Sequence, residues 1–360
     1  MHDVTRALLT RNRPVDRRMW RSFWDELHSG GLQPGETVAL LASLATRGPD
    51  PDTLGGLLRS LDERRPATVA QPAGTVNIVG TGGGPRTFNI STASAFVAAA
   101  MGVRVVKTGS RAHTGTCGSF DLLEHLGIGL TTSYGQTEAV LERFGIAFPG
   151  HFVYPRELTS LARSILPMEL RTLGGFLNGI GPFLAAMPVS CQLVGVSDPS
   201  LLRSLRGLAA QVTDRRIWLC ANELGVDELV GSVDNVIHTY DHTYDPAGTG
   251  GGGTGEIRLR AGALVPASGA ITELRPADAK AEVVEHFLGV LSGRGTGLAT
   301  GTVCLNAAAL AVASGHGGQW TWTGAVAAAG EALRGGAALD LVHRLRAQPA
   351  HRPIDTVSPR

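Results

Sequence analysis

The sequence lacks the features that mark several classes of protein. Its 360 residues include only 4 cysteines, far apart and without a CxxC pair, which argues against a disulfide scaffold or a zinc site and fits a reducing cytoplasm. No run of 18 apolar residues is present, so no transmembrane helix is expected. The N-terminus has no apolar signal-peptide core, so a secretory signal is not expected either.

An excess of charge of one sign is also missing. Lys and Arg together number 32 and Asp and Glu number 31, for a formal net charge of +1. This balance argues against a general binder of nucleic acid or of membrane surfaces. Lysine itself is scarce, because only Lys107 and Lys280 are present, and Lys107 is the only lysine in the first half of the chain.

Glycine, by contrast, is over-represented. The chain has 48 glycines, where average usage would give about 25. They follow no Gly-X-Y period, which excludes collagen. One cluster, PAGTGGGGTG at 246–255, is interpreted as a flexible connection between strands, and a second lies at 80–84.

Periodicity divides the chain into two parts. Apolar residues at helical spacing predict three helices before residue 66, so a small, mainly α-helical domain is expected over 1–72. From residue 73 helices alternate with short apolar runs, which is typical of an α/β domain with a mostly parallel sheet flanked by helices. This larger domain is expected to span 73–348, followed by a polar tail at 349–360. Its strand candidates are 75–79, 103–107, 189–196 and 216–221.

A phosphate site is indicated where the first of these strands runs into the glycines at 80–84. Glycine lets backbone N–H groups approach anionic oxygens, and the N-terminus of a following helix adds partial positive charge. The pattern matches neither GxxxxGK[ST] nor GxGxxG, and a tight structural turn is an open alternative. The segment 87–92, TFNIST, then offers four hydrogen-bonding side chains before a predicted helix at 93–101, more than a helix cap needs.

Two further features suit a polyphosphate with a divalent ion. Lys107 ends the second predicted strand, where its ammonium can face phosphate, the alternative being a surface lysine. Asp227 and Glu228 form an adjacent carboxylate pair after a strand candidate. Such a pair can hold Mg²⁺. Most Asp-Glu pairs lie at the solvated surface, so this pair indicates a metal site only in combination with the glycines.

These pieces together resemble the anthranilate phosphoribosyltransferase family, in the glycosyl-transfer class that also includes pyrimidine nucleoside phosphorylases. The resemblance covers residues 20–346. It implies a small helical domain completed by helices near 160–187, with the active site between it and the α/β domain. The matching pieces are GTGGGPRTFNIST (80–92), KTGSRAHTGTCGS followed by DLLEHLG (107–127), FLNGIGPFL (176–184), GVDEL (225–229), LNAAAL (305–310) and GEALRGGAALDLVHRL (330–345).

The resemblance implies transfer from 5-phosphoribosyl 1-pyrophosphate (PRPP) with two Mg²⁺ ions, by a cytoplasmic homodimer. Catalysis would be mostly positioning and electrostatics, with Lys107 and His113 as candidate catalytic residues. The expected metal ligands are Ser91, Asp227 and Glu228. The expected PRPP-binding residues are Gly80, Thr81, Gly82, Gly83, Thr87, Asn89, Ser91, Thr92, Lys107 and Ser119.

Departures from the family pattern fall mainly on the acceptor side. Gly84 stands where the family has an aspartate in a loop one residue longer, and Thr108 and Ser110 replace the histidine and asparagine of KHGNR. Without these and a securely placed arginine, a flat aromatic carboxylate loses its partners, so we expect a hydroxyl or amine acceptor, such as an aminocyclitol or aminoglycoside. The expected acceptor residues are Thr108, Ser110, Arg111, His113, Tyr154, Arg163 and Arg171.

Three alternatives stay open at this point. The acceptor can be anthranilate after all. The segment AHTG at 112–115 followed by DLLE at 121–124 resembles pyrimidine nucleoside phosphorylases, with His113 as acid or base, but a phosphorylase needs no metal pair. The third alternative is an inactive paralogue that acts as a binding protein. Because the net charge is nearly neutral, nucleic acid is the least expected ligand of such a protein.

Overall fold

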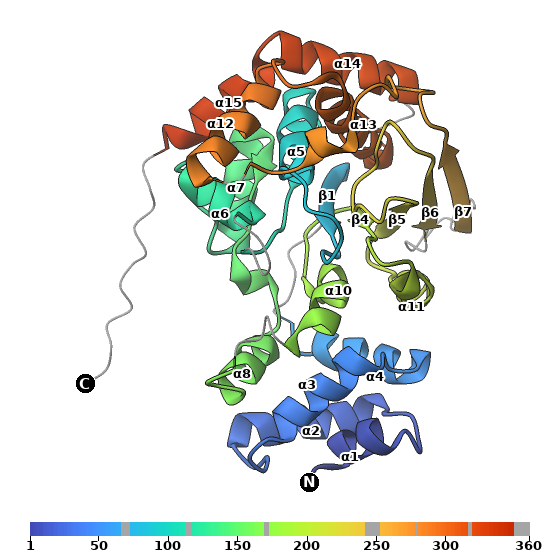
Figure 1. The fold of residues 1–360 in the computed structure, drawn as a ribbon. Helices are drawn as coiled ribbons and strands as arrows, with labels where there is room; N and C mark the ends of the chain where they lie inside the picture. Colours follow the sequence, from blue (N-terminus) through green and yellow to red (C-terminus); the bar gives the residue numbers. More distant parts are fainter. Residues whose placement is uncertain are drawn as a thin grey trace.

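The first 65 residues fold into four helices, α1 to α4, which lie together at one end of the molecule (Figure 1). Trp20, Phe23 and Trp24 form their core, with 0–1% of each side chain exposed, and the two tryptophan rings stack at 5.7 Å. Sequence periodicity predicted three of these helices and missed α1. The helices are α1 Asp3–Thr10, α2 Arg17–Ser29, α3 Glu36–Thr46 and α4 Pro51–Asp62.

Two later helices pack on these four. Helix α8 (Arg156–Ser164) contacts α2, and α10 (Gly175–Leu184) contacts α3 and α4. Figure 1 shows α10 between the N-terminal helices and the strands. The structure is a computed structural model that describes residues 1–65, 73–111, 117–168, 173–241, 253–277, 279–315 and 319–348, so the predicted tail at 349–360 and most of the glycine cluster at 246–255 lie outside it.

The rest of the chain forms an α/β domain around one seven-stranded sheet, which confirms the predicted fold class. The strand order is β3-β2-β1-β4-β5-β6-β7; the first five are parallel to their neighbours, and β6 and β7 extend the sheet antiparallel. The order reverses between β1 and β4, and in open α/β sheets such a switch point forms a crevice at the carboxyl ends of the strands. The strands are β1 Thr75–Gly80, β2 Arg104–Val106, β3 Ile146–Ala147, β4 Cys191–Gly195, β5 Arg216–Asn222, β6 Asn235–Asp241 and β7 Gly253–Leu259.

Helix α13 is the central helix of this domain. It packs on α5, α14, β1 and β4. Among the described residues it is the one helix long and apolar enough to cross a membrane, but 83% of that stretch is buried inside the protein, as in the core helix of a globular domain. The further helices are α5 Ile90–Ala100, α6 Ser119–His125, α7 Tyr134–Phe144, α11 Pro199–Ala209, α12 Lys280–Leu291, α13 Gly297–Ser314, α14 Trp322–Arg334 and α15 Ala337–Arg346, with short 3₁₀ helices at His151–Val153 and Ile271–Leu274.

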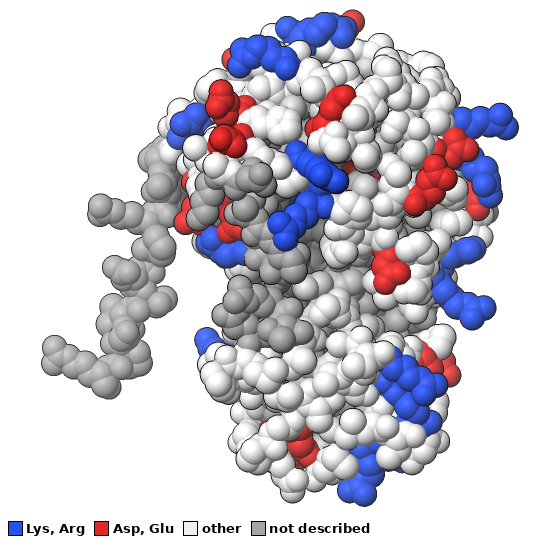
Figure 2. Space-filling model, in the orientation of Figure 1, with Lys and Arg blue, Asp and Glu red and all other residues white. Residues whose placement is uncertain are grey.

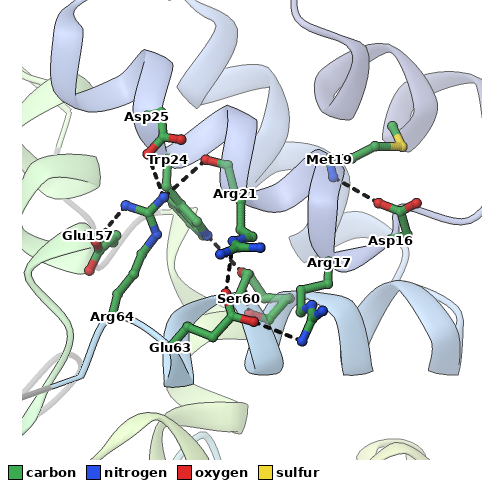
Figure 3. Close-up of polar contacts among 11 residues, drawn as sticks. Asp16, Arg17, Met19, Arg21, Trp24, Asp25, Ser60, Glu63, Arg64 and Glu157 are labelled. Carbon is green, nitrogen blue, oxygen red and sulfur yellow. Dashed lines mark hydrogen bonds and ion pairs between the residues drawn. The ribbon is translucent and has the colours of Figure 1, made fainter. Parts of the chain in front are cut away.

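Arg64 ties α8 to the N-terminal helices (Figure 3). Its guanidinium lies 3.5 Å from Glu157 Oε1 and 2.5 Å from Asp25 Oδ1, and it donates to the carbonyl of Arg21 at 3.2 Å. The Glu157 side chain is 6% exposed and the Asp25 side chain 69%, so water screens only the second ion pair. Glu157 therefore depends on Arg64 for its compensating charge.

Replacing Arg64 tests this tether. Arg64→Met leaves the Glu157 carboxylate buried without a cation, so the free energy of unfolding is expected to fall by about 3 kcal/mol. Asp25→Asn removes only the exposed partner and is expected to cost less than about 1 kcal/mol. Denaturant titration of both variants measures this difference, and Glu157→Gln added to Arg64→Met should recover most of the loss. Equal losses for Arg64→Met and Asp25→Asn would contradict the assignment.

Candidate active site

The loops that follow β1 and β4 are fastened to each other at the switch point. The Thr81 N–H donates to the carbonyl of Gly195 at 2.9 Å, and the Ser197 N–H donates to Thr81 Oγ1 at 3.2 Å. The Ser197 hydroxyl also donates to the carbonyl of Gly82. Since Thr81 and Ser197 are only 4% and 6% exposed, these bonds fix the glycine loop, residues 80–84, against the end of β4.

Asp227 lies directly against the glycine loop. Its Oδ2 accepts a hydrogen bond from the Gly82 N–H at 3.0 Å. A Cβ atom on Gly80 would lie 1.8 Å from the same oxygen, and a Cβ on Gly195 would lie 1.6 Å from the carbonyl oxygen of Asp227. Any side chain at 80 or 195 would therefore displace Asp227. Gly80 has a steric role here that the phosphate interpretation did not include.

Gly84, where the family pattern has aspartate, is equally confined. A Cβ there would lie 2.3 Å from the carbonyl oxygen of Gly225 and 2.7 Å from Ser197 Cβ. Gly82 and Gly83, in contrast, have φ angles of +68° and +84° and open space around them, so backbone conformation alone requires glycine at these two positions. In this shortened loop the backbone at Gly84 packs so closely on Gly225 and Ser197 that an aspartate would not fit there.

Glu228 follows Asp227 in the chain and is buried. The Thr87 hydroxyl lies 3.4 Å from each of its carboxyl oxygens. Burial raises the pKa of the Glu228 carboxyl well above its usual value, and the charge and hydrogen bond of Asp227 raise it further, while Thr87 and Lys107 act in the opposite direction. Burial and the neighbouring Asp227 thus both disfavour the charged form of Glu228.

Lys107 lies beside this carboxylate pair inside the domain. It is 2% exposed, and its Nζ donates to the carbonyls of Ile78 at 3.2 Å and Thr108 at 2.9 Å. Burial lowers the pKa of its ammonium to about 8, against the raising effect of Glu228 and Asp227. The ammonium thus compensates buried negative charge, and its predicted contact with phosphate stays a prediction.

The carboxylate pair fits a divalent cation. A cation bound by Asp227 and Glu228 would offset the repulsion between their negative charges. Mg²⁺ is commonly held by one or two carboxylates together with water and substrate phosphates, so no third protein carboxylate is required. The described ranges indeed contain no group of three or more His, Cys, Asp or Glu that could hold a metal ion.

Two asparagines hold the backbone on either side of this pair. Asn222, at the end of β5, donates to the carbonyls of Val226 at 3.0 Å and Glu228 at 2.8 Å. Asn306, from α13, accepts from the Leu229 N–H at 3.0 Å and donates to the Leu229 carbonyl at 2.7 Å. Sequence reasoning named neither as a site residue. Asn306 does lie in the LNAAAL segment, but its partner is 77 residues away and could not be read from that motif.

The remaining predicted PRPP residues lie at the starts of α5 and α6. Asn89 is the N-cap of α5 with φ 61°, and its amide donates to the carbonyl of Cys117 at 3.3 Å. Helix α5 thus begins three residues earlier than predicted and includes Ser91 and Thr92. The Thr92 hydroxyl is buried without a hydrogen-bond partner in the described part of the chain. Ser119 opens α6, where its hydroxyl accepts from the Ser110 N–H at 3.2 Å. No described contact joins Ser91 to the carboxylate pair, so its role as a metal ligand stays a prediction.

Thr108 belongs to a buried hydrogen-bonded chain. Asn77 donates to the Thr108 hydroxyl and accepts from the Thr108 N–H, both at 3.1 Å. The same Asn77 amide lies 3.2 Å from Gln192 Oε1, and the Gln192 amide donates to the carbonyl of Pro182 in α10 at 2.8 Å. Thr108 is only 2% exposed, so its hydroxyl is engaged inside the domain, and its contact with an acceptor stays a prediction.

The other predicted acceptor residues differ in exposure and in their partners. Arg111 is 60% exposed and pairs with Asp121 at 3.0 Å and Glu124 at 2.7 Å on α6. Arg163 is exposed on α8, while burial raises the pKa of the Tyr154 phenol to about 12. His113 and Arg171 lie outside the described residues.

Comparison with known proteins shows the family of this chain. A family model described as "Glycosyl transferase family, a/b domain" matches residues 73–339. The anthranilate phosphoribosyltransferase of Desulfitobacterium hafniense (strain DSM 10664 / DCB-2) is 34% identical over 224 residues, which cover 62% of this chain and 66% of that protein. The one from Cenarchaeum symbiosum (strain A) is 32% identical over 329 residues, 89% of each chain.

Solved structures show the same fold. Anthranilate phosphoribosyltransferase from Thermus thermophilus superposes with a TM-score of 0.73 at 26% identity, covering 96% of this chain and 99% of that one. The enzyme from Saccharomyces cerevisiae in complex with PRPP and Mg gives a TM-score of 0.74 at 18% identity, covering 95% of both chains, a likeness of fold alone. On the match to residues 73–339 and the alignment over 89% of the archaeal relative, this chain belongs to the anthranilate phosphoribosyltransferase family of glycosyl transferases.

Proposed function

We propose that this protein is a Mg²⁺-dependent phosphoribosyltransferase that uses PRPP as donor and releases pyrophosphate. The buried pair Asp227 and Glu228, pressed against the glycine loop at the switch point of the sheet, is the observation that carries the proposal. Family membership supports it, because the named relatives are phosphoribosyltransferases and one solved neighbour is described in complex with PRPP and Mg. The predicted homodimer and cytoplasmic location remain predictions.

The residues at the switch point suit a polyanionic leaving group. Gly82 and Gly83 let the loop backbone approach anionic oxygens, and the Gly82 N–H, now bonded to Asp227, is a donor that a phosphate oxygen can use. Asp227 and Glu228 would hold Mg²⁺, which when bound neutralises negative charge on the leaving pyrophosphate. Lys107 adds a buried positive charge next to them.

The reaction needs no protein nucleophile. The acceptor oxygen or nitrogen forms a bond to ribose C1 while the bond from C1 to the pyrophosphate oxygen breaks, and the acceptor proton leaves to solvent or to a base. Positive charge that develops at the ribose is stabilised by positioning and by the surrounding charges rather than by a covalent intermediate. The site would therefore contribute orientation and charge compensation.

We further propose that the acceptor is a hydroxyl or amine compound other than anthranilate, such as an aminocyclitol or aminoglycoside. Thr108 is buried and bonded to Asn77, and Arg111 is paired with two carboxylates on α6. Neither side chain is then free to pair with an aromatic carboxylate. Anthranilate is the second candidate, favoured by the activity for which the relatives at 32% and 34% identity are named.

A membrane-surface or nucleic-acid role receives no support from the visible surface. On the face shown in Figure 2, Lys and Arg side chains alternate with Asp and Glu side chains in small groups, without a wide area of one sign. A site for a phosphate backbone normally needs clustered positive charge. The 32 basic and 31 acidic residues of the chain thus leave no wide area of one sign on this face.

The carboxylate pair provides the first functional test. Asp227→Asn with Glu228→Gln is expected to weaken Mg²⁺-dependent PRPP binding by about 100-fold or more, because the charge that holds the cation is removed. Calorimetric titration of PRPP with and without Mg²⁺ measures it. The control is Asp62→Asn with Glu63→Gln, the same dipeptide at the surface, where the side chains are 66% and 31% exposed.

The outcomes of that titration separate the open functions. Unchanged PRPP affinity in the Asp227/Glu228 variant would sink the proposed metal site. Binding of a nucleoside with inorganic phosphate, and none of PRPP, would instead indicate a phosphorylase. Binding of DNA that falls steeply with salt would indicate a binding protein.

Gly80 provides a test of the geometry around Asp227. Gly80→Ala places a methyl group where Asp227 Oδ2 now lies, so we expect a loss of about 1–3 kcal/mol in unfolding free energy from overpacking. We also expect about 10-fold weaker Mg²⁺-dependent PRPP binding, because the displaced carboxylate no longer faces Glu228. Gly129→Ala is the control, because no atom lies within 4 Å of that added methyl group. Wild-type binding and stability in Gly80→Ala would show that the carboxylate is not confined there.

The acceptor is tested by turnover. With PRPP and Mg²⁺, we expect pyrophosphate release when an aminocyclitol or aminoglycoside is added. We expect kcat/KM for anthranilate to be at least about 100-fold lower, because the site offers no partner for the anthranilate carboxylate. Product mass confirms which compound received the phosphoribosyl group. Rapid turnover of anthranilate would establish the second candidate and overturn the acceptor proposal while leaving the donor site intact.

A further inference from the structure

Asn306 on α13 is buried at the back of the carboxylate pair. It is 1% exposed, and its carboxamide makes three hydrogen bonds. Oδ1 accepts from the Leu229 N–H at 3.0 Å, and Nδ2 donates to the carbonyls of Leu229 at 2.7 Å and Thr302 at 2.8 Å. The bond to Thr302, one turn earlier on the same helix, fixes the orientation of the amide plane. Both remaining bonds go to a single residue of the loop between β5 and β6, Leu229.

That residue directly follows Glu228. Asn306 binds both the N–H and the carbonyl of Leu229, which fixes the peptide bond that follows Glu228. Asn222, at the end of β5, donates to the carbonyl of Glu228 at 2.8 Å. The direction of the Glu228 side chain is then set by its own backbone and by Thr87. Helix α13 also packs on α5 and β1, the elements that flank the glycine loop.

We propose that Asn306 is a positioning residue for the cation site, acting through the backbone of Leu229 to hold the Glu228 carboxylate in place. The inference rests on the proposed function, because it assigns Glu228 to a metal. The hydrogen bonds of Asn306 within the described part of the chain go to Leu229 and Thr302 and to neither carboxylate. Groups of this kind, which orient a ligand without binding the metal, typically change metal affinity by about 10- to 100-fold when they are lost.

The chain contains a matched control for this role. Asn235 is 2% exposed, accepts from the Val230 N–H at 2.8 Å, and donates to the carbonyls of Val230 at 2.8 Å and Val233 at 2.9 Å. It is therefore the same side chain, equally buried, with the same set of three backbone bonds. Asn235 holds Val230, which is one residue further along the chain from the carboxylates than Leu229 and is not joined to Glu228 by a peptide bond.

The experiment compares Asn306→Ala with Asn235→Ala in the full chain. Both are expected to lose unfolding free energy, because each leaves buried backbone groups unpaired. PRPP binding is then titrated at a series of Mg²⁺ concentrations, and Mn²⁺ binding with pyrophosphate present is followed by electron paramagnetic resonance. In Asn306→Ala the cation concentration for half-saturation is expected to rise by about 10-fold or more, with PRPP binding restored at high Mg²⁺. Asn235→Ala is expected to keep the wild-type cation dependence.

Each result decides the proposal. An unchanged Mg²⁺ and Mn²⁺ dependence in Asn306→Ala, or an equal shift in both variants, would overturn it, because Asn306 would then serve stability alone. If Asn306→Ala does not fold, Asn222→Ala tests the same segment from β5 and is expected to shift the cation dependence in the same direction, and its failure to do so counts against the proposal. Wild-type PRPP binding that needs no divalent cation would instead defeat the proposed function.

Discussion

Asp227 lies against the ends of two neighbouring parallel strands, where glycine at 80 leaves room for its carboxylate and glycine at 195 leaves room for its backbone carbonyl. Its bond to the Gly82 N–H joins the loop after β1 to the loop after β5. The site depends on this contact, because it places a negative side chain against the backbone donors of the glycine loop. Gly84 extends the same packing to Gly225 and Ser197, so the glycine loop has little freedom to move away.

Charge compensation follows from that packing. Glu228 and Lys107 are almost fully buried, and in the low dielectric of the interior each would be costly alone. Burial raises the pKa of Glu228 and lowers the pKa of Lys107, while the charge of each group shifts the pKa of the other in the opposite direction. A divalent cation suits the two adjacent carboxyl groups because it can be held by them and bring a phosphate ligand with it.

Much of the fold and part of the site were predictable from local patterns. The parallel strands at 75–80, 104–106, 191–195 and 216–222 lie close to their predicted positions, since apolar runs between turn residues depend only on neighbours in sequence. The short helix α1 was missed because its apolar stripe is brief, and the start of α5 was misplaced because Asn89, with a positive φ, caps it earlier than the Ser-Thr pair. The direction of Thr108 could not be predicted, because it depends on Asn77, 31 residues away.

The sequence by itself determined the class of the fold, the glycine loop and the presence of a carboxylate pair, because each of these depends on residues that are only a few positions apart in the chain. The tertiary structure decided what they mean for one another. Gly82 meets Asp227 across 145 residues, and Leu229 meets Asn306 across 77, since the strand order and the packing of α13 bring them together. Contacts of that length depend on how elements assemble, and for this reason the steric role of Gly80 and the support from Asn306 emerge only in the folded chain.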